Sequence, residues 1–262
     1  MSLVTLFKSV RINLRSPCTL VSACRFNSTT NNTNNNSTEQ NEQYEEDIKE
    51  KILCASLKFV PELGWSKDAL SAGAQTVGYP GVTHGLFHSG GADLVHYFQV
   101  SSNNKLVEIL KKLQEDSNPL PPVEFVEKAC KERLQMVVPY LGKWPQAIAI
   151  MSLPPNVPNS LATLLTMVDD ICYYAGDRSV DFNWYLRRIG IAGVYKATEL
   201  YLIQDKSAEH EESWRFLNRR LEDAVQLHDL ISKSDVASQG AKDTALSAFV
   251  TARNILGLNW NR

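Results

Sequence analysis

Apolar residues recur every three to four positions along most of this chain, and that spacing restricts what it can fold into. Within residues 45–60, for example, Ile48, Ile52, Ala55 and Phe59 fall on one face of a helix. No run of alternating apolar and polar residues is bounded by turn formers, which is the pattern of a half-buried strand. The sequence therefore predicts an all-α protein.

Segments containing Gly and Pro separate the predicted helices. The stretch DSNPLPP at 116–122 is rich in proline and turn formers, and we place a domain boundary there. This gives a helix-turn-helix-like head at 44–115 and a larger helical domain at 123–233, followed by an amphipathic helix within 241–258. The predicted helices span 45–60, 66–77, 82–87, 92–113, 123–141, 144–153, 160–175, 182–204, 208–230 and 241–256.

The N-terminal region has the composition of a targeting segment followed by a linker. Residues 1–27 contain Arg and Ser but no Asp or Glu, and their apolar residues recur at helical spacing, which predicts a mitochondrial transit peptide. An unspecific disordered tail is the alternative. The Asn-, Ser- and Thr-rich segment at 28–43 cannot bury a core, so we predict a disordered linker there.

The head has the outline of a helix-turn-helix but lacks the residues that read DNA. A recognition helix contacts phosphates and bases through Arg, Lys, Asn or Gln, yet Lys67 is the only Lys or Arg between residues 66 and 103. Four of the 27 basic residues and none of the 29 acidic ones lie in the first 38 positions, so the remainder carries an excess of six acidic residues. Both features predict that the chain does not bind nucleic acid.

Signatures of catalysis are missing from the sequence. It contains no GxSxG, GxGxxG, GxxxxGK[ST] or HExxH motif and no CxxC pair. The nearest approach to a di-iron motif is a single Asp93-x-x-His96, whereas such a bundle needs Glu-x-x-His on two helices and two further Glu. We therefore expect neither catalysis nor a cofactor nor a bound metal.

The predicted helix at 160–175 carries an adjacent pair of carboxylates, Asp169 and Asp170. Neighbouring residues point about 100° apart on a helix, so the pair would not share one metal ion without other ligands. With Ile171 and Tyr174 beside them, they could form an acidic and aromatic contact surface. A solvated polar face is an equally good interpretation.

The predicted helix at 182–204 contains two arginines in an otherwise apolar sequence, preceded by two aromatic residues. Trp184 and Tyr185 each lie one turn from Arg188, which suits a phosphate bound at the mouth of an apolar pocket. The alternative is a structural ion pair between Arg188 and a nearby acidic residue, with Asp169, Asp177 and Asp181 as candidates.

The last predicted helix is amphipathic and has two interpretations. It could pack on its own domain, or it could lie in a membrane interface with its tryptophan at the level of the headgroups. The candidate membrane-contact residues are Leu246, Phe249, Val250, Leu256 and Trp260.

Several stretches carry a family resemblance. The segments ILCASLKFVPELGW and ALSAGAQTVGY resemble the three-helix head of TetR-type regulators. LKFVPELGWS, MVVPYLGKWPQAIAIMSLPPNVPNSL, MVDDICYYAGDRSVDFNWYLRRIGIAGVYKATELYLIQD and SWRFLNRRLEDA resemble the mitochondrial accessory proteins of ubiquinone biosynthesis. This likeness extends over about 52–258.

The resemblance implies a lipid-binding protein with a TetR-like fold. Members of this family bind isoprenoid quinone intermediates and phospholipid in an apolar cavity. They associate with the di-iron hydroxylase of demethoxyubiquinone, dimerise through their late helices, and contact the inner membrane on its matrix face through their C-terminal helix. By matching positions, Arg188 would contact a phospholipid headgroup. The positions that would bind the hydroxylase are Asp169, Ile171, Tyr174, Trp184 and Tyr185.

These observations lead to one expected function and two alternatives. We expect a non-catalytic accessory protein that presents demethoxyubiquinone from the inner mitochondrial membrane to its hydroxylase. A ligand-responsive TetR-like transcription regulator is the main alternative, and salt-dependent binding to duplex DNA would favour it. An enzyme of quinone or lipid metabolism is the other, and turnover without a partner protein would favour that.

Overall fold

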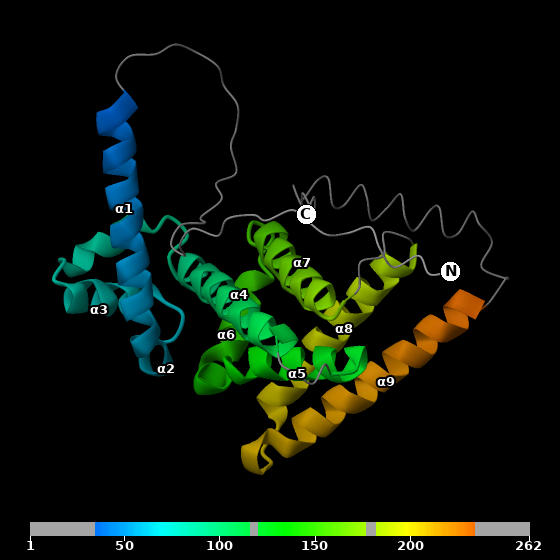
Figure 1. Cartoon of the computed structure of the whole chain (residues 1–262). Coiled ribbons are helices and arrows are strands. Elements are labelled where there is room, and N and C mark those ends of the chain that lie inside the picture. The colour runs from blue at the N-terminus through cyan, green and yellow to red at the C-terminus, as the bar shows by residue number, and fades with distance from the viewer. Residues whose placement is uncertain (1–34, 116–119, 177–181, 234–262) are drawn as a thin grey trace. The chain divides into compact units, whose positions relative to one another are not determined.

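The computed structural model describes residues 35–115, 120–176 and 182–233, with side chains described for 44–115, 120–176 and 187–226. All regular structure in these ranges is helical, which confirms the predicted all-α class (Figure 1). Two compact units divide the chain, 1–42 and 43–262, and the cores and pockets below belong to the second. The predicted helix at 241–256 lies outside the described residues.

The described helices follow the predicted order. They are α1 (Asn35–Ser56), α2 (Val60–Leu63), α3 (Lys67–Val77), α4 (Gly91–Glu115), α5 (Pro122–Gln135), α6 (Trp144–Met151), α7 (Val157–Tyr174), α8 (Phe182–Gln204) and α9 (Glu211–Lys233). Short 3₁₀ turns lie between them: η1 (Leu57–Phe59), η2 (Gly81–Leu86), η3 (Val138–Lys143) and η4 (Ala208–His210). None of these helices combines the length and apolarity needed to cross a membrane.

Local sequence explains where most helices end. It also explains why some helix ends differ from the predicted ones. The Ser66 side chain accepts a hydrogen bond from the Ala69 amide at the start of α3, and Gly78 closes that helix in the left-handed conformation. The predicted helix at 123–141 instead ends at Gln135. Pro139 is the physical reason, because it lacks an amide hydrogen and its ring would clash with the Gln135 carbonyl.

Two further differences concern the head. α1 begins at Asn35 and so includes residues 35–43 of the segment predicted to be a linker, where Glu and Gln favour a helix and neither Gly nor Pro interrupts it. The expected helix at 82–87 is the 3₁₀ turn η2 (Gly81–Leu86) rather than an α-helix. Glycines within it weaken α-helical propensity, which fits this short irregular turn.

The first core is centred on packed aromatic rings. Trp65 and Phe98 lie with their ring centroids 5.5 Å apart, and Trp144 lies 5.6 Å from Trp65 and 5.3 Å from Phe98. Tyr140 of η3 contacts both Trp65 and Phe98. This core therefore joins residues from both sides of the proline-rich segment at 116–122.

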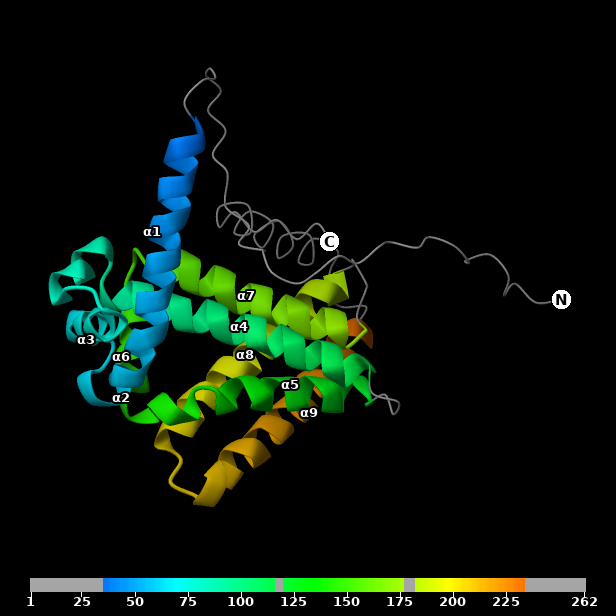
Figure 2. The ribbon, with the colours of Figure 1, turned by 60° about the vertical axis from the view of Figure 1, so that its left-hand side comes forward.

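The second core fills the space between α4, α5, α7, α8 and α9. Figures 1 and 2 both show α4 and α7 lying side by side, and α9 packs along α8. Helix α4 contributes to both cores: Phe98 lies in the first, and Leu106 and Leu110 lie in the second. The other fully buried members of the second core include Ala129, Cys130, Leu134, Val168, Ile171, Leu202 and Leu217.

Candidate functional site

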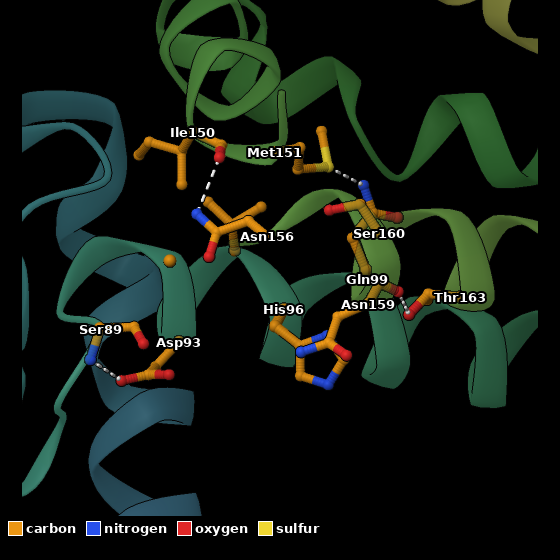
Figure 3. A pocket seen from close by; sticks show the side chains of 12 residues that line it. Ser89, Asp93, His96, Gln99, Ile150, Met151, Asn156, Asn159, Ser160 and Thr163 are labelled. Atoms are coloured by element: carbon orange, nitrogen blue, oxygen red, sulfur yellow. Dashed lines mark hydrogen bonds between the residues drawn. The ribbon is translucent and has the colours of Figure 1, made fainter. Parts of the chain in front are cut away.

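A small polar pocket lies between α4 and the α6–α7 region (Figure 3). Its volume is about 70 Å³, which suits one or two water molecules or a small polar group rather than a lipid chain. Its polar lining comprises Ser89, Asp93, His96, Gln99, Asn156, Asn159, Ser160 and Thr163.

Hydrogen bonds within the protein fix several side chains of this pocket. Asp93 accepts a hydrogen bond from the Ser89 amide at 2.9 Å, and Asn156 donates to the Ile150 carbonyl at 2.9 Å. Gln99 donates to the sulfur of Met151 at 3.4 Å, and its carbonyl oxygen accepts a hydrogen bond from Arg133 behind the pocket wall. These hydrogen bonds hold the side chains of Asp93, Gln99 and Asn156 in place around the pocket.

His96 is the titratable imidazole of this pocket, and its ionisation bears on what the pocket can bind. Burial lowers the pKa of His96 below its ordinary value of 6.5, and the nearby Asp93 carboxylate opposes that effect. The ring is therefore neutral at neutral pH, when it can both donate and accept a hydrogen bond. Among the described residues, no three His, Cys, Asp or Glu side chains are grouped to hold a metal ion.

A larger and more apolar groove also lies beside α4. Its volume is about 400 Å³, within the range of sites for small organic ligands. Leu53 of α1, Leu86 and Phe87 of the η2 region, and Val100 of α4 supply its apolar lining. His96 and Asp93 line both this groove and the polar pocket.

The structure shows the ion pair that was one of the two interpretations of Arg188. Its guanidinium Nε donates to Asp169 Oδ1 at 2.8 Å, and the residue is only 2 % exposed. The structural ion pair with Asp169, the first of the candidate partners, is therefore present. A lipid headgroup at Arg188 would have to share the guanidinium with this carboxylate.

Some of the other residues predicted to bind a partner are buried rather than exposed. Ile171 is fully buried in the second core, so the expectation that it contacts a partner at the surface is wrong. The physical reason is that Ile171 continues the buried stripe formed by Met167 and Val168 on α7. Asp170 is also buried, which argues against a solvated face at that position.

Aromatic residues at the end of α7 divide between core and surface. Tyr174 packs against the second core, and its ring contacts that of Tyr173 edge-on, with the centroids 5.3 Å apart. Tyr173 is the more exposed of the two, and Ile189 of α8 is a further exposed apolar side chain. Sequence reasoning did not single out Tyr173 or Ile189. The side chains of Trp184 and Tyr185, like all of Leu246, Phe249, Val250, Leu256 and Trp260, lie outside the described residues.

Arg133 was not predicted as a functional residue, although the sequence carries a signal for it. It falls on the apolar stripe of α5 with Ala129 and Cys130, where an arginine is unexpected. In the structure it is fully buried, and its Nε donates to the Asn103 side chain at 2.9 Å.

Comparisons with known proteins identify the family. The model of the N-terminal domain of ubiquinone biosynthesis protein COQ9 matches residues 45–75, and the COQ9 model matches residues 157–228. The mitochondrial ubiquinone biosynthesis protein COQ9 of Drosophila melanogaster is 47 % identical over 217 residues, covering 82 % of this chain and 67 % of that protein. The chain belongs to the COQ9 family.

Less similar COQ9 proteins match a comparable share of the chain. COQ9-A of Xenopus laevis is 39 % identical and COQ9 of Homo sapiens is 37 % identical, each over 223 residues that cover 83 % of this chain and 70 % of the relative. All three relatives are named mitochondrial, in agreement with the predicted location. The COQ9 match at 157–228 includes the Asp169–Arg188 pair and the exposed Tyr173.

Proposed function

We propose that this chain is a non-catalytic accessory protein of mitochondrial ubiquinone biosynthesis that binds isoprenoid quinone intermediates and phospholipid. The observation that carries the proposal is its membership of the COQ9 family, whose relatives are named ubiquinone biosynthesis proteins. A polyprenyl quinone is too apolar to diffuse freely through water, because each buried CH₂ favours an apolar environment by about 0.8 kcal/mol. A carrier that covers the tail lowers that cost.

The proposed partner is the di-iron hydroxylase that acts on demethoxyubiquinone. We propose that it binds on the α7–α8 surface, at Asp169, Tyr174, Trp184 and Tyr185, and we add the exposed Tyr173 to this set. Ile171 is not included because it is buried. The C-terminal residues from Leu246 to Trp260 are proposed to contact the inner membrane, and the late helices to form a homodimer.

The apolar groove of about 400 Å³ beside α4 is within the size range of sites for small organic ligands, which supports the proposal that the chain binds one. The experiment that tests the proposal is extraction and mass spectrometry of lipids from the purified full-length chain, alongside native mass spectrometry. Copurified quinone, isoprenoid or phospholipid is the expected result. A protein that stays empty, and that also fails to take up quinone from vesicles, would contradict it.

The alternative of a transcription regulator calls for a separate measurement. The turn η2 has the sequence GVTHGL, which contains no Lys or Arg to contact phosphate. We expect no salt-dependent affinity for duplex DNA in a titration with the same preparation. Tight binding that weakens steeply with added salt would favour the regulator instead.

A further inference from the structure

Met151, the last residue of α6, lies between the first core and the small polar pocket. Its side chain packs against that core, lines the pocket of about 70 Å³ and stays partly exposed. The amide nitrogen of Gln99 on α4 donates a hydrogen bond to its sulfur, at a distance of 3.4 Å (Figure 3). A methionine that only filled a gap in the core would need no polar partner at its sulfur, so this contact calls for another explanation.

The orientation of the Gln99 amide is fixed from its other end. Its carbonyl oxygen accepts a hydrogen bond from Arg133, and a guanidinium group can only donate. The amide nitrogen must therefore face the sulfur of Met151. Arg133 is itself fully buried and also donates to Asn103, which holds the guanidinium in place. Because a thioether is a weak acceptor, Gln99 offers a good donor to a poor partner.

Oxidation of the sulfur by hydrogen peroxide would create a better partner for that donor. In this reaction the O–O bond of the peroxide breaks, one oxygen bonds to the sulfur, and the other leaves as water with both hydrogens. The sulfur is oxidised by two electrons and the peroxide is reduced by two, and the product is a polar sulfoxide. The pocket has room for peroxide, because its volume of about 70 Å³ exceeds the roughly 30 Å³ that one water molecule occupies in the liquid.

The pocket also suits the product. The sulfoxide oxygen accepts hydrogen bonds, and Gln99 already lies beside the sulfur. Asn159 and Ser160 line the same pocket and carry further donors. The flexible methionine side chain has three rotatable bonds, so it can turn the new oxygen towards these groups.

The other methionines among the described residues have different surroundings. Met167 is 2 % exposed and belongs to the second core, and Met136 is partly buried against the same core. Neither of them lines the polar pocket. They are therefore internal standards for the reactivity of Met151 in the same chain.

We propose that Met151 is a modification site, at which hydrogen peroxide forms a sulfoxide that Gln99 then binds. The modification is reversible, because methionine sulfoxide reductases restore the thioether. It acts on the contact between α4 and α6, since Gln99 and Met151 belong to these two helices. This inference does not depend on the ligand that the chain carries.

The first experiment measures which methionine is oxidised. Full-length protein is exposed to hydrogen peroxide, and mass spectrometry of its peptides follows sulfoxide formation at Met136, Met151 and Met167 over time. We expect Met151 to react at least about tenfold faster than Met167, and faster than Met136. Unfolding in urea should abolish these differences, because the three thioethers are chemically alike. Oxidation of folded Met151 at or below the rate of either standard would overturn the proposal.

The second experiment asks whether Gln99 binds the sulfoxide. The midpoint of thermal unfolding is measured before and after oxidation, at a reaction time when Met151 alone has reacted, in the wild type and in Gln99→Leu. We expect oxidation to lower the midpoint by about 2–4 °C more in Gln99→Leu, because leucine cannot donate a hydrogen bond. Comparing each protein with its own oxidised form cancels the effect of the lost contact with Arg133. Gln204→Leu is the control, since Gln204 is exposed and does not line the pocket.

A third variant tests the same site without oxidation, and it also serves if Gln99→Leu does not fold. In Met151→Gln the side-chain carbonyl provides the acceptor that the sulfoxide would provide. We expect its unfolding midpoint to lie within about 2 °C of the wild type, and that of Met167→Gln to fall by at least about 5 °C. Equal losses on oxidation in the wild type and Gln99→Leu, or a Met151→Gln protein as unstable as Met167→Gln, would overturn the role of Gln99.

Discussion

Two sites show how single residues are constrained in this protein, one by a close contact between two helix backbones and the other by a buried charge. Gly73 of α3 lies against the end of α1, where a Cβ atom would overlap Ser56 Oγ and lie 2.7 Å from the Ser56 amide nitrogen. Asp169 and Arg188 form an ion pair in which the arginine side chain is almost fully buried. Both sites allow predictions about stability that do not depend on the proposed function.

Gly73→Ala is expected to destabilise the fold, by about 1–3 kcal/mol, because the backbone of Ser56 would have to move. Gly193→Ala on α8 is the matched control, since no described atom lies within 4 Å of its added Cβ. That control should be more stable by up to about 1 kcal/mol, from helix propensity alone. Urea unfolding of both variants measures the two effects, and equal midpoints would contradict the close contact at Gly73.

Arg188→Met is expected to lower the free energy of unfolding by about 3 kcal/mol, because it leaves the Asp169 carboxylate without this partner. Asp169→Asn in the same chain should restore part of the loss. A double-mutant cycle in urea checks this coupling, and strictly additive effects would argue against it.

At the scale of elements, the turns between helices hold the arrangement through specific hydrogen bonds. Asp205, between α8 and α9, accepts hydrogen bonds from the amides of Ser207 and Ser213 at 2.8 and 2.9 Å. The Ser213 hydroxyl also donates to it. This carboxylate orders the first turn of α9, much as an N-cap does.

The hydrogen bonds to Asp205 predict that the stability of the fold depends on pH. Burial on its own raises the pKa of Asp205, but hydrogen bonds from Ser213 and Ser207 outweigh it and lower the pKa from 3.8 to about 2. A carboxylate whose pKa is lower in the folded than in the unfolded chain stabilises the fold at any pH above its unfolded-chain pKa. This stabilisation is lost as the pH falls to the folded-chain pKa. Asp205→Asn should therefore be less stable than wild type at pH 7, with the gap shrinking between about pH 4 and pH 2.

Urea midpoints at several pH values measure this gap. Asp223→Asn serves as the control, since Asp223 pairs with Arg220 on an exposed face of α9 and should change stability little. A gap between wild type and Asp205→Asn that stays constant down to pH 2 would contradict the role of the charged carboxylate.

Helix positions could be predicted from the sequence because spacing and capping are local properties. The prediction failed at Pro139, where one residue overrides a continuous apolar pattern, and at the start of α1, where a polar composition still forms a helix. Ile171 was misassigned because matching positions in a family does not reveal which side of α7 faces the core. Its spacing from Met167 and Val168 already carried that information.

The candidate site was less accessible from sequence because its contacts join distant segments. The Asp169–Arg188 pair was one of three open possibilities, and only the packing of α7 against α8 selected it. Arg133 of α5 donates hydrogen bonds to Asn103 and Gln99 of α4, which lie about 30 residues earlier in the chain. No local pattern specifies which side chains of another helix a buried arginine contacts, so these hydrogen bonds required the structure.

At the scale of the whole molecule, α4 connects the two cores and should make unfolding of the second unit cooperative. Trp144→Ala in the first core is expected to cost about 3–5 kcal/mol, and Leu110→Ala in the second about 2–5 kcal/mol. Both should shift one common transition. Circular dichroism and tryptophan fluorescence followed through thermal unfolding check this, and two transitions that respond separately to the two variants would contradict it.

The aromatic core also has a consequence for when the chain can fold. Trp65 and Phe98 need Tyr140 and Trp144 as neighbours, and these follow later in the chain. A chain emerging N-terminus first, from a ribosome or through a translocation pore, therefore cannot complete its head until Trp144 has come through. Until then the side chains around Trp65 stay exposed to water, and that interval is when a chaperone has a binding site on this protein.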